Sequence, residues 1–380
     1  MVVFLLKYFD LEMEDGGHLA INDEYLKPYV ASVLEFLDGL DYMNMLSFAR
    51  SMMLSQEIKA NNTIEGIMDD LSLIDKVINS KNDISLDAKK RIINLYHGYE
   101  YILSHNDINK DSLRELYSIL SSGLLNDFNI ERTGKYYRTA PVYLYRGRRI
   151  DEYPMQGADF SKIDYYMDMY FDFVNSSDLT GIDGFIKSQI MHFYFVYIHP
   201  YMDLNGRTGR TTSMWYLVKN KNYPYIIFNR AIAFSQREYE KNIIKCRMHD
   251  EVTLFVKYVL QQVLLEFEKE HVIHNIQCNC PYELSNVDLQ MIEYLLSTSS
   301  NLTALDLAQT YNNYNGRRKP WDIVFERIMP LIDKDVFVAT PCGKAKDGKK
   351  TNLSLGLNGD LVSTSARSKI KHLKLDNYLR

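Results

Sequence analysis

The sequence predicts a mainly helical protein with one short β-hairpin near its middle and a separate module at its C-terminus. Apolar residues recur every three or four positions in many segments, which is the spacing of one face of an α-helix. Aromatic and β-branched residues bounded by Pro141 and Gly147 predict the hairpin. A chain of 380 residues, 46% hydrophobic and 24% charged, is ordinary for a globular protein of two or three domains.

Charge is unevenly distributed along the chain. The formal net charge of -5 predicts no general attraction to nucleic acid or to a membrane surface. Residues 311–380, however, hold 14 Lys and Arg against 7 Asp and Glu, so this segment carries +7 and the remainder carries -12. The C-terminal segment therefore differs from the rest of the chain in the partners that its charge allows.

Residues 1–125 predict an N-terminal region of successive helices. Helical spacing is clear in residues 29–37, 73–78 and 92–103. Asn61 and Asn62 are typical of a helix start, and Gly66 indicates a close approach of the backbone to a neighbouring segment.

Residues 126–270 predict a second region that combines the hairpin with the most apolar helices. Residues 185–197 are apolar nearly all round, which predicts a buried core helix. His192 lies on this helix, and a hydrogen-bonded core histidine is a more common interpretation than a metal ligand. Two further helical runs lie within residues 225–270.

A polar connection at residues 198–210 joins two apolar segments and suits a polyphosphate. Asn205-Gly206 is a strong turn pair, and a turn that leads into a helix presents backbone N–H groups and the positive helix end to an anion. Arg207 and Arg210 are three residues apart, so they share one face of such a helix and can bind phosphates as forks.

The same connection holds a candidate base and a candidate metal ligand. An imidazole of ordinary pKa is mostly neutral near pH 7, so His199 can accept a proton. Asp203 offers a hard oxygen ligand of the kind that Mg²⁺ prefers when phosphate oxygens share the ion. A solvated polar loop is the usual explanation for scattered charges, but it does not explain this many groups at fixed spacing.

The connection resembles the signature of the Fic family, His-Pro-Phe-x-(Asp/Glu)-Gly-Asn-Gly-Arg-x-x-Arg. Tyr201 stands where the family has Phe, and Leu204 stands where it usually has Gly, whose missing Cβ lets the backbone approach phosphates. The matching residues are His199, Pro200, Asp203, Asn205, Gly206, Arg207 and Arg210.

The resemblance implies a protein adenylyltransferase, which transfers AMP from ATP to a Ser, Thr or Tyr hydroxyl of an unidentified target protein. It implies that His199 takes the proton of the attacking hydroxyl and that Asp203 holds Mg²⁺. Pyrophosphate leaves. The nucleotide and its phosphates would be bound by Asn205, Gly206, Arg207, Arg210 and, near the adenine, Tyr239.

Glu65 gains a second meaning from the same resemblance. Many members of the family carry an inhibitory segment, (Ser/Thr)-x-x-x-Glu-(Gly/Asn), whose glutamate pairs with the last arginine of the signature. Ile64-Glu65-Gly66 fits this pattern, with Asn61 in the Ser/Thr position. The resemblance therefore implies a Glu65–Arg210 ion pair that restrains activity, whereas Glu65 taken by itself is a surface acid.

The hairpin also has a counterpart in the family, the flap that overhangs the active site. The resemblance implies that a target segment pairs with this hairpin as an added strand, at Val142, Tyr143 and Leu144. An ordinary solvent-facing hairpin is the alternative.

Residues 281–380 predict three helices followed by a basic hairpin, which resembles the winged helix-turn-helix that often follows Fic domains. Helical runs begin near Val287, Thr303 and Trp321, and two short strands flank a lysine-rich turn at residues 343–350. With the local +7, this module permits DNA binding through Arg317, Arg318, Lys319 and the turn lysines, or protein contacts instead.

Other sequence features predict few additional functions. The four cysteines are too few for a disulfide framework, and the first ten residues lack a signal-peptide pattern, so we expect a cytoplasmic protein without a membrane partner. The spacing of His271, His274, Cys278 and Cys280 fits no common zinc site. Two alternatives to adenylyl transfer remain: a DNA-binding regulator with a degenerate Fic core, and a Fic enzyme that uses another phosphate donor or removes AMP.

Overall fold

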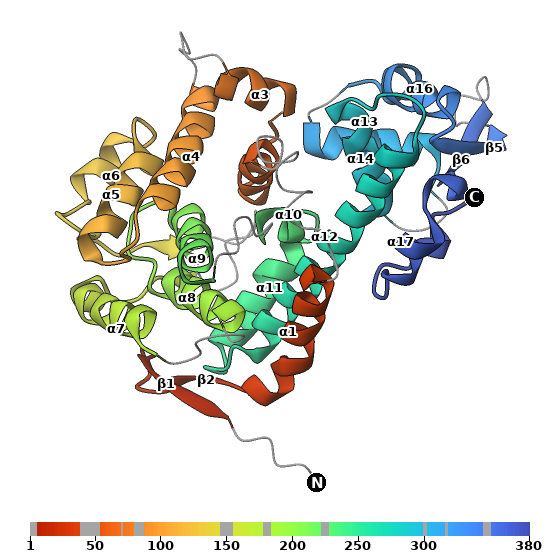
Figure 1. The fold of residues 1–380 in the computed structure, drawn as a ribbon. Coiled ribbons are helices and arrows are strands. Elements are labelled where there is room, and N and C mark those ends of the chain that lie inside the picture. Colours follow the sequence, from red (N-terminus) through yellow and green to blue (C-terminus); the bar gives the residue numbers. More distant parts are fainter. Residues whose placement is uncertain are drawn as a thin grey trace. The chain divides into compact units, whose positions relative to one another are not determined.

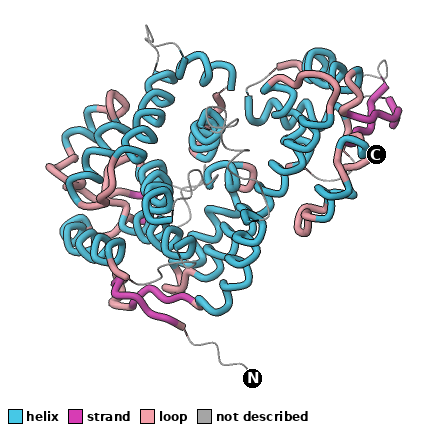
Figure 2. The backbone as a smooth tube through the Cα atoms, viewed as in Figure 1, coloured by secondary structure: helices cyan, strands magenta, loops and turns pink. Residues whose placement is uncertain are grey.

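The structure, a computed structural model, divides the chain into two compact units, Met1–Glu35 with Lys76–Gln261 and Phe36–Asp75 with Gln262–Arg380. Helices dominate, and the strands found in the described ranges form three separate antiparallel pairs (Figure 2). The mainly helical prediction is confirmed, while the predicted boundaries near residues 125 and 270 remain a prediction. The structure describes residues 6–38, 54–69, 71–79, 87–144, 155–177, 184–221, 228–298, 302–315, 318–344 and 351–380.

The first unit is built around two consecutive helices, α8 (Gly184–Ile198) and α9 (Asn205–Lys221), which pack against each other. Helices α4 (Asp87–Ser104) and α5 (Lys110–Ser121) pack on α9, and α7 (Ile163–Asn175) packs on α8 (Figure 1). Every side chain of α8 except Val196 is buried, which confirms the predicted core helix.

Small residues let α9 approach α8 closely. A Cβ added at Gly209 would lie 3.0 Å from Cδ1 of Phe195, so a larger residue there would force the helices apart. Thr208 and Thr212 are fully buried, and each hydroxyl donates to a carbonyl four residues earlier in the chain, at 2.9 and 2.8 Å. The polar face of α9 is therefore satisfied inside the core rather than by solvent.

An N-terminal hairpin, β1 (Lys7–Glu12) and β2 (His18–Ile21), was not predicted. Phe9 packs edge-on against Phe173 of α7, with ring centroids 5.2 Å apart, and the hydroxyl of Tyr194 donates to the carbonyl of Glu12 at 2.7 Å. The hairpin is thus part of the core of the first unit.

The central hairpin has shorter strands, and more residues between them, than the sequence predicts. Its strands β3 (Tyr143–Leu144) and β4 (Met155–Gln156) pair antiparallel, so the partner strand lies beyond residue 147, outside the segment bounded by Pro141 and Gly147 that predicted the hairpin. Tyr145, Arg146 and Gly147, which the prediction included, lie outside the described residues. The remaining helices of this region are α6 (Asp127–Glu131), α10 (Phe228–Ala233), α11 (Gln236–Arg247) and α12 (Thr253–Asn279), of which α6 and α10 were not predicted.

The second unit contains the three C-terminal helices and the hairpin that the sequence predicts, together with one short helix after the hairpin that was not predicted. Thr303 forms a bridge with Ser354 of β6, and Arg317 and residues 345–350, where most of the turn lysines lie, are outside the described residues. The elements are α13 (Asn286–Leu296), α14 (Ala304–Asn315), a helix running through α15 (Pro320–Ile323), η3 (Val324–Ile328) and α16 (Met329–Asp333), the strands β5 (Phe337–Lys344) and β6 (Thr351–Leu357), and α17 (Thr364–Ser368).

Asn61 and Asn62 do not start a helix, as the sequence suggested. They lie near the end of a helical segment, residues 54–64, and Gly66 follows it with a φ of 76°. The amides of Gly66 and Ile67 donate back to the carbonyls of Thr63 and Asn62 at 2.9 and 3.0 Å. Gly66 therefore ends the helix in the left-handed conformation that glycine adopts without a steric penalty, and nothing lies within 4 Å of a Cβ added there. The helix α3 (Leu71–Asn79) comes next.

A buried carboxylate fixes the C-terminal segment in the second unit. Glu268 of α12, with its side chain 1% exposed, accepts hydrogen bonds from the amides of Lys371, His372 and Leu373 at 2.5 to 3.1 Å. Nδ1 of His372 also lies 3.0 Å from this carboxylate. Three converging amides compensate the charge that burial would otherwise penalise.

Substitution Glu268→Gln should lower the free energy of unfolding by about 2 to 4 kcal/mol, because the amide NH₂ faces backbone donors and the charge is lost. Urea denaturation would measure the change, and hydrogen exchange at residues 371–373 would locate it. Glu240→Gln, at an exposed position on α11, is the control and should stay within about 0.5 kcal/mol. Equal stability of the two variants would contradict this role of Glu268.

Candidate active site

The loop between α8 and α9 reverses the chain through two left-handed residues. His199 has a φ of 54° and Leu204 a φ of 64°, a region that non-glycine residues seldom occupy. The surrounding structure must hold these residues in place, and such strain is common where a site is preorganised.

Asn205 braces this loop from the first residue of α9. Its Oδ1 accepts from the amide of Tyr201 at 2.9 Å, and its Nδ2 donates to the carbonyl of Tyr201 at 2.8 Å. The ring of Tyr201 stacks on Tyr117 of α5, with centroids 3.6 Å apart and planes 8° from parallel. The geometry gives Asn205 a structural task, and its phosphate-binding role remains a prediction.

His199 is half-buried and its ring orientation suits a base. Nδ1 lies 3.3 Å from the carbonyl of Val196, a contact that favours the tautomer with its proton on Nδ1. Nε2 is then the proton acceptor. The amide of His199 donates to Phe195 at 2.9 Å and so closes the last turn of α8.

Leu204 explains why a glycine suits this position in the Fic signature. Its backbone is left-handed while its side chain is 8% exposed, so a buried leucine occupies a conformation that favours glycine. Its carbonyl accepts the amide of Thr208 at 3.0 Å, the first bond of α9. An apolar side chain at this capping position offers no oxygen to the first amides of the helix.

Asp203 is exposed at the same end of the loop. One carboxylate oxygen accepts from the amide of Leu204 at 2.7 Å, which orients the group. Across the described ranges, no three His, Cys, Asp or Glu side chains gather to hold a metal ion. A single exposed carboxylate fits Mg²⁺ bound mainly by substrate phosphates and water, which is a common arrangement for this ion.

Arg207 and Arg210 lie on the first two turns of α9, as predicted, and both side chains are buried, at 7% and 4% exposure. They flank the positive end of the helix, where first-turn amides such as that of Gly206 have no acceptor inside the helix. The positive groups predicted for phosphate binding therefore gather at one helix end.

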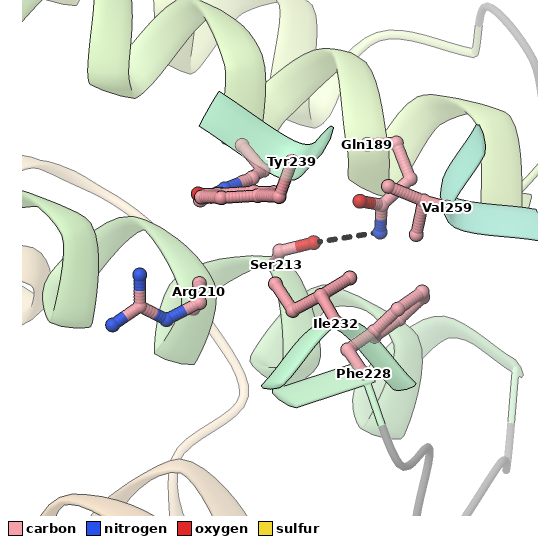
Figure 3. A pocket seen from close by; sticks show the side chains of 8 residues that line it. Gln189, Arg210, Ser213, Phe228, Ile232, Tyr239 and Val259 are labelled. Atoms are coloured by element: carbon pink, nitrogen blue, oxygen red, sulfur yellow. Dashed lines mark hydrogen bonds between the residues drawn. The ribbon is translucent and has the colours of Figure 1, made fainter. Parts of the chain in front are cut away.

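A small pocket lies beside Arg210, and Figure 3 shows the Arg210 guanidinium directed away from Ser213 and the apolar lining. The space in this pocket is about 250 Å³ when the part open to solvent is counted. Its lining comes from four helices besides α9: Gln189, His192, Arg210, Ser213, Phe228, Ile232, Tyr239 and Val259.

Tyr239 both lines this pocket and packs in the core. Its hydroxyl lies 2.6 Å from Nε2 of His192, and its ring stacks on that imidazole with centroids 5.9 Å apart. Burial, and then the charge of Arg210, lower the pKa of His192 to about 3. His192 is therefore a neutral, hydrogen-bonded core histidine, as predicted. The role of Tyr239 near adenine stays a prediction.

The central hairpin passes directly beside the catalytic candidate. A Cβ added at Gly157, just after β4, would lie 3.0 Å from Cβ of His199 and 2.8 Å from Cγ1 of Val142. Tyr143 is exposed, whereas the side chain of Leu144 lies outside the described part of the structure. The structure thus brings the predicted flap and His199 together, and only glycine fits at residue 157.

Sequence reasoning missed Gly157 and also Arg138. The Arg138 side chain donates to the backbone carbonyls of His199 at 2.8 Å, of Ala140 at 2.7 Å and of Ala158. No sequence motif indicates this role, because the partners of Arg138 are backbone carbonyls, two of which, those of Ala158 and His199, are distant in sequence. The signal available was an arginine within a short aromatic segment that the hairpin prediction did not use.

Glu65 belongs to the other compact unit, in the turn after residues 54–64, where its amide donates to the carbonyl of Asn62 at 3.0 Å. The predicted Glu65–Arg210 pair therefore remains a prediction.

At residue 204, glycine should be more stabilising than alanine. Both Leu204→Gly and Leu204→Ala remove the buried side chain, but only glycine relieves the left-handed strain, so Leu204→Gly should be more stable by about 1 kcal/mol. Leu116, fully buried in the middle of α5, is the control, where alanine should be better by about 1 kcal/mol. Urea denaturation of the four variants checks the reversal, and the same order at both positions would refute it.

Comparison with known proteins agrees with this geometry. Residues 86–217 match the Fic/DOC family model. A Fic family protein from Desulfovibrio desulfuricans G20 is similar in structure, with a TM-score of 0.57 and 18% identity, over 88% of this chain and 96% of that chain. Fic-1 from C. elegans has a TM-score of 0.52 and 19% identity, over 65% of this chain and 72% of that chain.

A third structure, a Fic domain containing signaling protein from Bacteroides thetaiotaomicron VPI-5482, has a TM-score of 0.50 and 14% identity, over 64% of this chain and 94% of that chain. The matched segment holds α4 to α9, the flap strands and the loop between α8 and α9. The chain therefore contains a Fic/DOC family domain at residues 86–217 and has the fold of Fic family proteins.

Proposed function

We propose that this protein is an adenylyltransferase that transfers AMP from ATP to a Ser, Thr or Tyr hydroxyl of a target protein. The observation that supports the proposal is the loop between α8 and α9, which has His199 at one end and the positive terminus of α9 at the other, with His199 directly beside the flap. No helix in the described ranges is both long and apolar enough to cross a membrane.

His199 is the proposed general base. With its proton on Nδ1 against Val196, Nε2 accepts the proton of the target hydroxyl as that oxygen attacks the α-phosphate of ATP in line. The bond from the α-phosphate to the bridging oxygen breaks, and pyrophosphate leaves. Because the ring orientation is already fixed, less entropy is lost when the hydroxyl attacks.

The phosphates are proposed to bind at the start of α9. Arg207 and Arg210 neutralise phosphate oxygens, and the amide of Gly206 donates to them together with the helix dipole. Asp203 would hold Mg²⁺, which supplies charge neutralisation of the phosphates when it is bound. The nucleobase is proposed to point toward the pocket beside Arg210, which Tyr239 lines.

The flap is proposed to bind the target. Strand β3 has the exposed Tyr143, and a target segment paired with the flap would have its hydroxyl near His199, because Gly157 lies against that residue. Strand addition supplies affinity through the backbone and so tolerates varied target sequences.

We propose further that Glu65 restrains this activity by pairing with Arg210, as the resemblance implies. A carboxylate on the arginine would compete with the phosphates for the same positive charge.

Self-labelling by ATP with a tagged α-phosphate tests the activity and its restraint. Glu65→Gly should raise label incorporation at least about tenfold, and adding His199→Ala should lower it about 10² to 10⁴-fold, the range of general-base catalysis. His97→Ala, at an exposed histidine of α4, is the matched control and should label like its parent.

The outcomes discriminate between the candidate functions. A label that comes from the γ-phosphate would indicate phosphoryl transfer from ATP, and a label that comes only from another nucleotide would indicate another donor. Loss of tag from a pre-labelled protein would indicate AMP removal. Absence of any label in Glu65→Gly would count against transferase activity altogether.

The C-terminal module supplies a second candidate function. We propose that residues 281–380 form a winged helix. The proposal is based on three helices followed by the β5–β6 hairpin, and on the Thr303–Ser354 bridge. Just before the module's third helix, Arg318 pairs with Glu326 of that helix at 2.6 Å, but both side chains are exposed. Such a pair is weak enough for a DNA phosphate to replace the carboxylate.

DNA binding through this module should depend steeply on salt. Mobility of a labelled duplex should show affinity at 50 mM salt that falls at least about tenfold by 200 mM, because counterions are released from the phosphates. Charge removal at Lys319 should weaken binding and reduce the slope by about one. A duplex that does not bind at 50 mM salt would leave the module with protein contacts.

A further inference from the structure

We infer that Arg138 is the positioning residue of this site, which fixes His199 and both ends of the flap relative to each other through one guanidinium. The inference rests on the proposed function for its catalytic consequence, and on hydrogen bonds for its geometry.

One side chain joins three segments that meet at the site. Nε of Arg138 donates to the carbonyl of His199 at 2.8 Å, and Nη1 donates to Ala140, on the segment entering β3, at 2.7 Å. Nη2 donates to Ala158, on the segment leaving β4. The backbone amide of Arg138 adds a bond to Pro200 at 2.9 Å.

These bonds stabilise the strained conformation of the base. The left-handed φ of His199 costs about 1 to 2 kcal/mol for a non-glycine residue, so it persists only where its surroundings compensate. Bonds from Arg138 to the carbonyls of His199 and of the next residue, Pro200, hold the two peptide planes that follow the left-handed residue. The imidazole direction follows from that backbone.

The two flap segments are also bonded to each other and to the base. The amide of Gly157 donates to Val142 at 3.0 Å, and the amide of Ala158 donates to Ile198, the residue before His199, at 3.2 Å. The guanidinium lies behind this contact, since a Cβ added at Gly157 would be 2.9 Å from Nη2 of Arg138. A shift of the flap would therefore move the carbonyls that surround His199.

Arginine suits this task because its acceptors are carbonyls in several directions. The side chain is 3% exposed, and no carboxylate in the described ranges lies within ion-pair distance of it. Burial lowers the pKa of Arg138 to about 10, against opposing effects of Glu14 and Asp159, so it stays charged near pH 7. A lysine would keep the charge but could not present a planar fork to three carbonyls.

Neighbouring residues hold the outgoing flap segment from its other side. Arg247 of α11 donates to the carbonyl of Gln156, and the carboxylate of Glu14 accepts from the amide of Asp159 at 2.8 Å. These contacts touch only one segment each. Arg138 alone among the described residues links the segment before β3, the segment after β4 and the carbonyl of His199.

Substitution Arg138→Lys tests the inference in the Glu65→Gly background. The maximal labelling rate should fall about 10²-fold, the cost of misplacing a catalytic group by about 1 Å, while KM for ATP stays within about twofold. Hydrogen exchange at Gly157 and Ala158 should rise at least about tenfold, because the fork that supports their bonds is gone.

Asn94→Ala is the structural control. Asn94 is buried and donates to the carbonyls of Leu120 and Ser122, so its loss destabilises the same unit without touching the loop or flap. It should leave exchange at residues 157–158 and the labelling rate unchanged at temperatures where the protein is folded.

The two readouts separate this inference from the proposed function. Wild-type exchange at residues 157–158 in Arg138→Lys overturns the inference whether or not any variant labels. Raised exchange with an unchanged labelling rate overturns it as well. If the Glu65→Gly parent does not label, the proposed function fails, and raised exchange at residues 157–158 still establishes that Arg138 holds the flap against His199.

Discussion

The reversal of the chain between α8 and α9 is the constraint on which the site depends. Helix α8 is buried on nearly all sides, and α9 packs small residues against it, so neither helix can move away to ease the turn. The short connection then requires left-handed conformations at both ends, at His199 and Leu204. Close packing of two helices thus becomes a fixed direction for the imidazole and for the amides at the start of α9.

The parts of the fold that could be predicted are those whose packing is indicated by a local pattern of apolar residues. Helix α8 is an example, because a continuous apolar run has no stable position outside a core. The hairpin β1–β2 and strand β4 were missed because a strand of few residues depends on a partner that the local pattern does not identify. Asn61 and Asn62 were misread because asparagine suits several positions at helix ends, and only the φ of Gly66 shows which end is present.

The site divides in the same way. The residues from His199 to Arg210 could be proposed as a site from the sequence because they are contiguous and carry chemically distinctive side chains. Arg138 and Gly157 could not, because one acts on backbone carbonyls, which every residue possesses, and the other acts by having no side chain where the flap meets His199. When a residue acts on the backbone of a distant segment, its role produces no residue pattern that can be recognised in the sequence.

Burial gives the positive groups of this site a particular energetic role. Arg138, Arg207 and Arg210 are each less than a tenth exposed, so most of their desolvation cost is met when the chain folds rather than when a ligand binds. The nearby His192 has its pKa lowered to about 3, so it is neutral near pH 7 and adds no charge to this region. In the proposed function, an incoming polyphosphate would lose its own hydration but would meet groups that have already lost theirs and are held in place. Electrostatic interactions in such a preorganised site gain more than at a solvated surface, because no protein dipoles need to reorient as charge develops. In the proposed function, these arginines therefore have distinct tasks: Arg138, bound to backbone carbonyls, holds the geometry, and Arg207 and Arg210 at the start of α9 supply the charge.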